Sequence, residues 1–197
     1  MKGWVIRVTR KGKLTVCFLF MICLAGIAAW GNSYLTQDPR LSPVDGAGNN
    51  VIFLYFDGSV ADNYCLGREW RRIPDDISLA AGGDENLLTL VRFTLEELIG
   101  GPNPGSKLAA TIPTGTKILA IDINEGIVSV DFSAELEQNH WGGSIREEIT
   151  VFSITNTLTQ FNGIEGVEIK IEGNSDGSIA GHIPLNQVFA HNWHLNQ

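Results

Sequence analysis

The stretch from Ile127 to Gly143 holds the side chains with the clearest potential for chemistry. Its sequence, IVSVDFSAELEQNHWGG, includes Asp131, Glu135 and His140, which could supply a general acid and a general base. Such a pair needs one carboxyl group in an apolar pocket and one in water, so that their pKa values separate. The sequence indicates no such pocket, because Asp131 falls on the opposite strand face from Phe132. We therefore interpret these residues as a solvated strand end, where Asp131 could also cap the backbone, and we predict no catalytic residue.

Two other motifs suggest cofactor sites at first sight. GGPNPGSK, at residues 100–107, is similar in composition to a phosphate loop, but Lys107 follows Ser106 instead of preceding it, and its prolines remove backbone N–H donors. HNWH spaces His191 and His194 by three residues, which on a helix would allow them to share a metal, but no third ligand is evident. We predict no cofactor and no metal site, and we interpret the second motif as part of a polar C-terminal tail.

Alternating strands and helices must position these residues. Hydrophobic periodicity predicts, in chain order, strands at 51–56 and 65–74, a helix that follows Asp84 and ends at Gly100–Pro102, strands at 117–123 and 127–133, a helix at 144–161 and a strand at 167–173. Asn124–Gly126 is a short hairpin signal, and Ser144 with Glu147 forms a predicted capping box. The order β-β-α-β-β-α-β predicts an α+β fold, with a small mixed β-sheet and two helices packed on it.

The helix predicted at 144–161 is apolar on two faces. One face carries Ile145, Ile149 and Phe152, and the opposite face carries Val151, Ile154, Leu158 and Phe161. A helix with two apolar faces needs two partners. We assign the face that ends at Phe161 to the sheet, and we expect the Ile145 face to pack either on the first helix or on another protein. Ile145, Ile149 and Phe152 are therefore the candidate partner face.

Residues 1–35 are distinct from the rest of the chain. They are basic without any acidic residue, and they include an uncharged apolar run from Leu14 to Trp30. This pattern predicts a cytoplasmic flank followed by a membrane anchor, with the remaining chain outside the cytoplasm; the alternative is secretion after signal cleavage near Ala28. Residues 36–50, rich in Pro, Gly, Asp and Asn, predict a flexible linker, and 51–197 the folded domain with its tail.

The charge of the chain also limits its partners. The formal net charge is −8, and because the N-terminal flank is positive, the predicted domain is more acidic than this total. An acidic domain repels a phosphate backbone, so we predict no binding to nucleic acid. Cys65 is the lone cysteine of the predicted domain and cannot form a disulfide within it.

Several segments of the predicted domain carry a family pattern when they are taken in order. They are VIFLYFDG (51–58), REWRRIP (68–74), LEELIGGPNPGSKLAATIPTGTKIL (95–119), GIVSVDFSAEL (126–136) and TNTLTQFNGIEGVEIKIEG (155–173). Together they resemble the GerMN family of sporulation and spore germination domains, over about residues 51–173. The resemblance implies an exported or anchored bacterial protein without known catalytic residues, and a fold similar to the ring-building domains of secretion-type assemblies.

The resemblance and the residues lead to one expected function. We expect a non-enzymatic domain that binds other proteins of a cell-envelope complex in sporulation or germination. Its N-terminal segment would attach it to the membrane, and a fold similar to ring-building domains would allow it to form rings. One alternative is an extracytoplasmic adaptor of a sensor kinase. A second is an enzyme acting on the cell wall through Asp131, Glu135 and His140, which would require these three side chains to converge in a concave pocket.

Overall fold

The computed structural model describes residues 50–75, 77 and 84–196. The predicted anchor at 1–35 lies outside these residues, as does nearly all of the predicted linker at 36–50. In the part of the chain that the structure describes, every helix is too short or too polar to cross a membrane.

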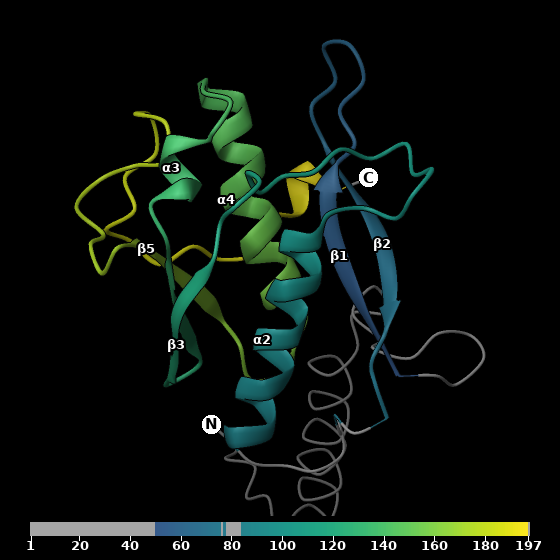
Figure 1. Cartoon of the computed structure of the whole chain (residues 1–197), viewed down its shortest axis with the longest axis vertical. Helices are drawn as coiled ribbons and strands as arrows, with labels where there is room; N and C mark the ends of the chain where they lie inside the picture. Colours follow the sequence, from purple (N-terminus) through teal and green to yellow (C-terminus); the bar gives the residue numbers. More distant parts are fainter. Residues whose placement is uncertain (1–49, 76, 78–83, 197) are drawn as a thin grey trace, which may run out of the picture. The chain divides into compact units, whose positions relative to one another are not determined.

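The strands form two small sheets (Figure 1). In the first sheet, β1 (Val51–Asp57) pairs antiparallel with β2 (Leu66–Arg72). The second sheet has the order β3-β4-β5 and contains β3 (Ile118–Asn124), β4 (Ile127–Phe132) and β5 (Gly166–Ile171). β4 is antiparallel to β3 and parallel to β5, so this sheet is mixed, as predicted. The α+β class and the predicted strand and helix order are confirmed, although the strands divide between two sheets instead of one.

Two long helices lie between the sheets (Figure 1). α2 (Asp84–Gly100) contacts β1 and β3, and α4 (Ser144–Leu158) contacts β1, β5 and α2. The shorter elements are α3 (Glu135–Gln138) and the 3-10 helix η2 (Trp193–Leu195). The predicted apolar arc of α2 faces inward, since Val91, Leu95 and Leu98 are buried, and the positive φ of Gly101 ends the helix.

The predicted hairpin between β3 and β4 is confirmed. Its two loop residues, Glu125 and Gly126, have φ angles of 48° and 81°. Two consecutive positive φ angles are typical of a type I′ turn, whose twist matches that of the flanking strands. The turn sets the register that pairs Ile123 with Val128.

Most residues of α4 are buried, and they include polar as well as apolar side chains. Its buried polar residues are Glu147, Thr150, Ser153, Thr155, Asn156 and Thr157. The predicted capping box is wrong: the N-cap residue is Gly143, with φ 85°, and no side chain caps the helix. Glu147 turns inward instead and accepts a hydrogen bond from the backbone N–H of Ala180 at 2.9 Å.

The C-terminal segment is part of the packed domain and not a polar tail. Ile179, Leu185 and Phe189 are buried in the main core. Phe189 exchanges two backbone hydrogen bonds with Val167 of β5, at 2.9 and 2.8 Å. The segment therefore extends the second sheet by one bridge and closes the core beside α4.

Candidate functional site

The three residues that were considered as an acid/base cluster bond to different parts of the chain. Asp131 Oδ1 accepts a hydrogen bond from the backbone N–H of Gly173 at 2.8 Å, which is the backbone cap considered from the sequence. A hydrogen bond from the Ser133 hydroxyl lowers the pKa of Glu135. His140 lies beside α4 instead. No hydrogen bond or ion pair joins these three side chains within the described residues.

His140 belongs to a hydrogen-bond network inside the domain. Its Nδ1 accepts from the backbone N–H of Gly142 at 3.1 Å, so its Nε2–H donates to Thr150 Oγ1, also at 3.1 Å. Thr150 Oγ1 in turn donates to the carbonyl oxygen of Thr111 at 2.7 Å. Burial lowers the pKa of His140, although the nearby Glu147 opposes this effect. The neutral imidazole therefore fits this network as a structural link between α4 and the loop before β3.

Polar side chains of α4 occupy the outer edge of β1. Ser153 Oγ donates to the carbonyl oxygen of Tyr55 at 2.6 Å, and Thr157 Oγ1 accepts from the Tyr55 N–H at 3.1 Å. Gln160, just beyond α4, accepts from the Phe53 N–H at 2.8 Å and donates to the Phe53 carbonyl oxygen at 2.7 Å. These side chains satisfy backbone groups that a neighbouring strand would otherwise pair. This is the physical reason why β1 does not continue into the second sheet.

Sequence reasoning missed this polar stripe, although a signal was present. Ser153, Thr157 and Gln160 are spaced by four and three residues, so they share one face of the helix. A uniformly polar helix face usually meets water. Here it meets the edge of β1, and the hydrogen bonds account for its side chains without any chemistry.

Of the two histidines in the HNWH motif, His191 is half-buried in the domain and His194 is exposed. His191 Nδ1 lies 2.9 Å from Thr159 Oγ1, and its ring stacks against Trp193 with 3.8 Å between centroids. Asn156 fixes the same segment by a hydrogen bond from its Nδ2 to the carbonyl oxygen of Asn192 and another to its Oδ1 from the Asn192 N–H. Among the described residues, no three His, Cys, Asp or Glu side chains are grouped so as to hold a metal ion.

The glycine- and proline-rich loop after α2 covers the charged residues on the inner face of β2. The Asn103 N–H donates to Glu69 Oε2 at 2.9 Å, and Arg71 Nη2 donates to the Gly101 carbonyl oxygen at 3.1 Å. Burial opposes ionisation of Glu69, but hydrogen bonds from Ser106, Asn103 and Arg71 outweigh it and lower its pKa. The loop thus bonds to the protein's own ionic side chains.

The candidate partner face is largely covered within the chain. Ile149 is 3% exposed and forms a cluster with Tyr55 and Leu66 of the β1–β2 sheet, not with α2. Phe152 is half-buried and packs edge-on against Phe189 with 6.2 Å between centroids. The second partner of α4 is therefore the first sheet together with the C-terminal segment. Ile145, 37% exposed, is the member of the set that remains accessible.

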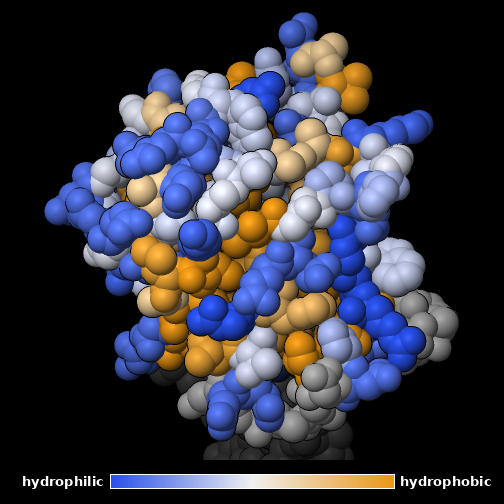
Figure 2. All heavy atoms as spheres, viewed as in Figure 1, coloured by the Kyte–Doolittle hydropathy of each residue, from blue (hydrophilic) through white to orange (hydrophobic). Residues whose placement is uncertain are grey.

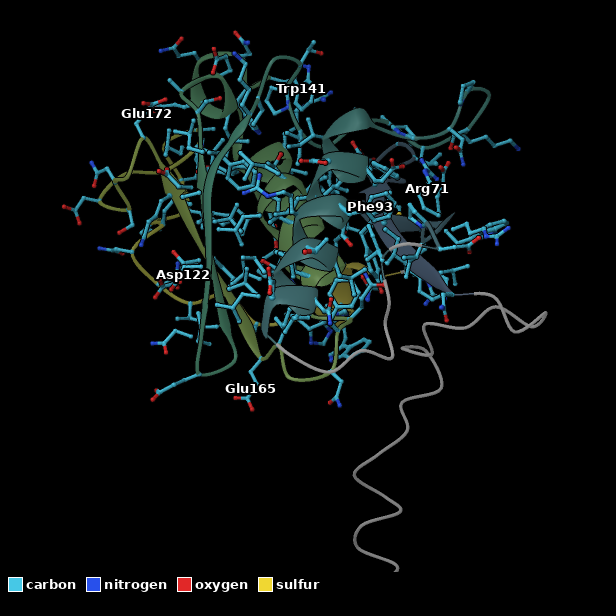
Figure 3. All side chains as sticks on the ribbon, turned by 60° about the horizontal axis from the view of Figure 1, so that its bottom comes forward. Arg71, Phe93, Asp122, Trp141, Glu165 and Glu172 are labelled. Atoms are coloured by element: carbon cyan, nitrogen blue, oxygen red, sulfur yellow. The ribbon has the colours of Figure 1, made fainter. Side chains whose placement is uncertain are left out.

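Ile145 belongs to an exposed group at the start of α4, which we call the α4 corner and define as Trp141, Ile145 and Arg146. Trp141 is 49% exposed, and the Arg146 guanidinium lies 6.0 Å from the centre of its ring. The two glycines between Trp141 and α4, at positions 142 and 143, have φ angles of 77° and 85° that a side chain would strain. Figure 3 shows Trp141 well apart from Arg71, Asp122 and Glu165.

Comparisons with known proteins agree with the pattern in the sequence. The family model named Germane, for sporulation and spore germination, matches residues 54–177. The tandem GerMN domains of the sporulation protein GerM from Bacillus subtilis have a TM-score of 0.55 to this chain at 18% identity, over 78% of this chain and 49% of that one. This chain therefore spans about half of that tandem structure, and the likeness shows the fold.

Two further solved structures match with lower structural similarity. The first GerMN domain of the same GerM protein is 21% identical, with a TM-score of 0.49, over 71% of this chain and 96% of that one. A Clostridium perfringens chain assigned as a lipoprotein is 24% identical, with a TM-score of 0.49, over 74% of this chain and 90% of that one. No curated protein matches the chain.

Proposed function

The chain belongs to the Germane family of sporulation and spore germination domains, and from this membership we propose that it is a non-enzymatic domain that binds other proteins outside the cytoplasm. Its partners are proteins of a cell-envelope complex that assembles during sporulation or germination. The basic and apolar residues 1–35 supply the membrane attachment in this proposal. The domain after the linker then presents its binding surface on the extracytoplasmic side.

The observation that carries the binding role is the exposure of Trp141 and Ile145 at the α4 corner. Tryptophan and arginine are the residue types that contribute most often to the energy of protein interfaces. Arg146 lies over the Trp141 ring, which restricts the ring before a partner arrives and reduces the entropy lost on binding. Behind the corner, α4 is fixed by its buried face, so the exposed residues stand on a rigid element.

The hydrogen bonds of the polar side chains also support a non-enzymatic function. Asp131 caps a backbone N–H and His140 donates to Thr150, so each has a structural task. An enzyme using Asp131, Glu135 and His140 would have to break these bonds to bring the three together. An adaptor of a sensor kinase would also be a protein-binding domain. Identifying the partner protein would distinguish this role from assembly of an envelope complex.

The test is crosslinking of the full-length chain in sporulating cells of its host, followed by identification of the captured proteins. Ile145→Asp places a charge in the α4 corner and should abolish specific crosslinks. Val188→Asp is the matched control, because Val188 is a 47% exposed aliphatic residue elsewhere, and it should keep them. Equal crosslinking by both variants, at equal abundance and with unchanged melting temperature, would refute binding through the corner.

A further inference from the structure

β2 carries a cationic and aromatic face on the outside of the first sheet. Arg68, Trp70 and Arg72 alternate with residues that face inward, so they share this face. Trp70 is 58% exposed, and the Arg72 side chain is 65% exposed. The Arg68 guanidinium lies 5.2 Å from the centre of the Phe53 ring of β1. We call Arg68, Trp70 and Arg72 the β2 strip.

The backbone N–H and C=O groups of the β2 strip point away from β1. α4 and Gln160 bond the N–H and C=O groups of Phe53 and Tyr55, so these two residues do not use them for β2. In an antiparallel pair of strands, two opposite residues direct their N–H and C=O groups either both toward each other or both away from each other. Trp70 lies opposite Phe53 and Arg68 lies opposite Tyr55. Their backbone groups are therefore directed to the outer edge of the sheet.

This outer edge already pairs with another segment at its first residue. Leu66, the first residue of β2, forms a parallel bridge with Asn196 of the C-terminal segment. Further along β2, a hollow of about 500 Å³ is lined by residues 68–72 and Asn103. An extended peptide could thus continue along the edge beyond the bridge, with its backbone beside the β2 strip.

The inner residues of β2 hold the strand in place. Arg71 contacts Glu69 at 3.0 Å and Glu97 at 3.4 Å, and its own side chain is 13% exposed. By contrast, the Arg72 ion pair with Asp75 joins two largely exposed side chains, and such pairs contribute little and exchange readily. A carboxylate of a partner can therefore replace Asp75 at low cost.

Charge and residue type indicate the partner. In a chain of net charge −8, the β2 strip is a local concentration of positive charge, and Figure 2 shows strongly hydrophilic side chains over β2. Cations on an edge strand can serve simply to prevent aggregation. An exposed tryptophan between them works against that purpose, since it adds apolar surface, but it suits an interface.

We propose that the outer edge of β2 binds an extended, acidic segment of a partner protein by strand addition. The segment's backbone pairs with Arg68, Trp70 and Arg72, its acidic side chains face the two arginines, and Trp70 packs over its centre. This surface is separate from the α4 corner in sequence and in its elements. The inference therefore stands or falls independently of the proposed function.

The experiment measures fluorescence anisotropy of a short labelled peptide in which glutamate alternates with threonine and valine, so that all glutamates lie on one strand face. The protein is the full-length chain in mild detergent. We expect saturable binding that weakens as salt is raised. Replacing the glutamates by glutamine should weaken binding about tenfold, and N-methylation of alternate backbone amides on one edge should do the same.

Protein variants locate the site. Trp70→Ala and Arg72→Gln should each lower the peptide affinity about tenfold without changing the melting temperature. Lys170→Gln is the matched control on β5, in the other sheet, and should bind normally. Absence of binding, or equal affinity of the wild type and both variants, would overturn the inference. Tight binding of the N-methylated peptide or of polyphosphate would also overturn it, since either result would mean that the site attracts any polyanion. Self-association of the chain through Trp70 would overturn it as well.

Discussion

Glu147 accepts two hydrogen bonds from His182, one from its backbone N–H at 2.9 Å and one from its ring Nδ1–H at 3.1 Å. The carboxylate has no exposed surface, and its other oxygen accepts from Ala180. A charge on the first turn of α4 thereby holds the C-terminal segment by three N–H donors. This contact holds the segment against α4, together with the buried side chains of Ile179, Leu185 and Phe189.

Glu147→Gln should lower the free energy of unfolding by about 2 kcal/mol. The amide keeps the shape of the carboxylate but places an NH₂ group against N–H donors, so at least one buried hydrogen bond is lost. Urea denaturation measures the change, and Glu148→Gln is the control on the adjacent, half-buried residue. If the two variants are equally stable, the contact with His182 does not hold the segment.

Thr157→Val tests whether α4 replaces a strand at the edge of β1. The change keeps the volume of the side chain but removes the acceptor of the buried Tyr55 N–H. An unsatisfied buried donor costs about 1–3 kcal/mol, which should appear in urea denaturation and as faster hydrogen exchange at Tyr55. Thr89→Val, on an exposed part of α2, should have little effect. Unchanged exchange at Tyr55 would show that another group satisfies its N–H.

His140 predicts a dependence of stability on pH. Burial lowers its pKa in the folded domain below the ordinary value of 6.5. Below pH 6.5 the unfolded chain therefore binds the proton more readily, and the free energy of unfolding falls as the pH drops from this value toward the folded pKa. His140→Gln should flatten this part of the curve, from pH 6.5 downward. His194→Gln, at an exposed histidine, should retain the wild-type slope. An equally flattened slope in this variant would mean that His140 is not the source of the pH dependence.

The strands and the two long helices could be predicted because their apolar residues repeat at the period of their own element. The division into two sheets could not, since it depends on Ser153, Thr157 and Gln160, whose types are equally compatible with a solvated face. The predicted capping box of Ser144 and Glu147 was wrong because residue types alone do not show which groups a side chain meets. The sequence pattern is local, whereas the donors that Glu147 meets lie more than thirty residues later.

For the candidate site, alternation along β4 places Asp131 on the opposite face from Phe132. Its hydrogen bond to Gly173 could be considered from the sequence only as one possibility, because the partner lies 42 residues later. The partner face was harder, because apolar periodicity shows that Ile149 is buried but not what buries it. Phe189, which packs on the same helix, lies in a segment with no readable period.

The hairpin turn offers a stabilising substitution. Glu125 has a φ of 48°, a left-handed conformation that asparagine adopts more readily than glutamate. Glu125→Asn should therefore raise the free energy of unfolding by about 0.5 kcal/mol, which thermal unfolding can detect. Asp176→Asn, at an exposed loop residue away from that turn, is the control for the loss of charge. An equal gain from both would assign the effect to charge and not to the backbone.

The last prediction separates the buried and exposed ends of one helix face. Ile149 packs against Tyr55 and Leu66, so Ile149→Asp places an unpaired charge in an apolar cluster and should unfold the domain. Ile149→Val, which removes one methyl group, should cost only about 1 kcal/mol. Ile145→Asp, one turn earlier and 37% exposed, should leave the melting temperature unchanged. Circular dichroism on the three variants measures this order. A folded Ile149→Asp variant would mean that the β1–β2 sheet can move off α4, and the face of Ile145, Ile149 and Phe152 would then be open to a partner along its whole length.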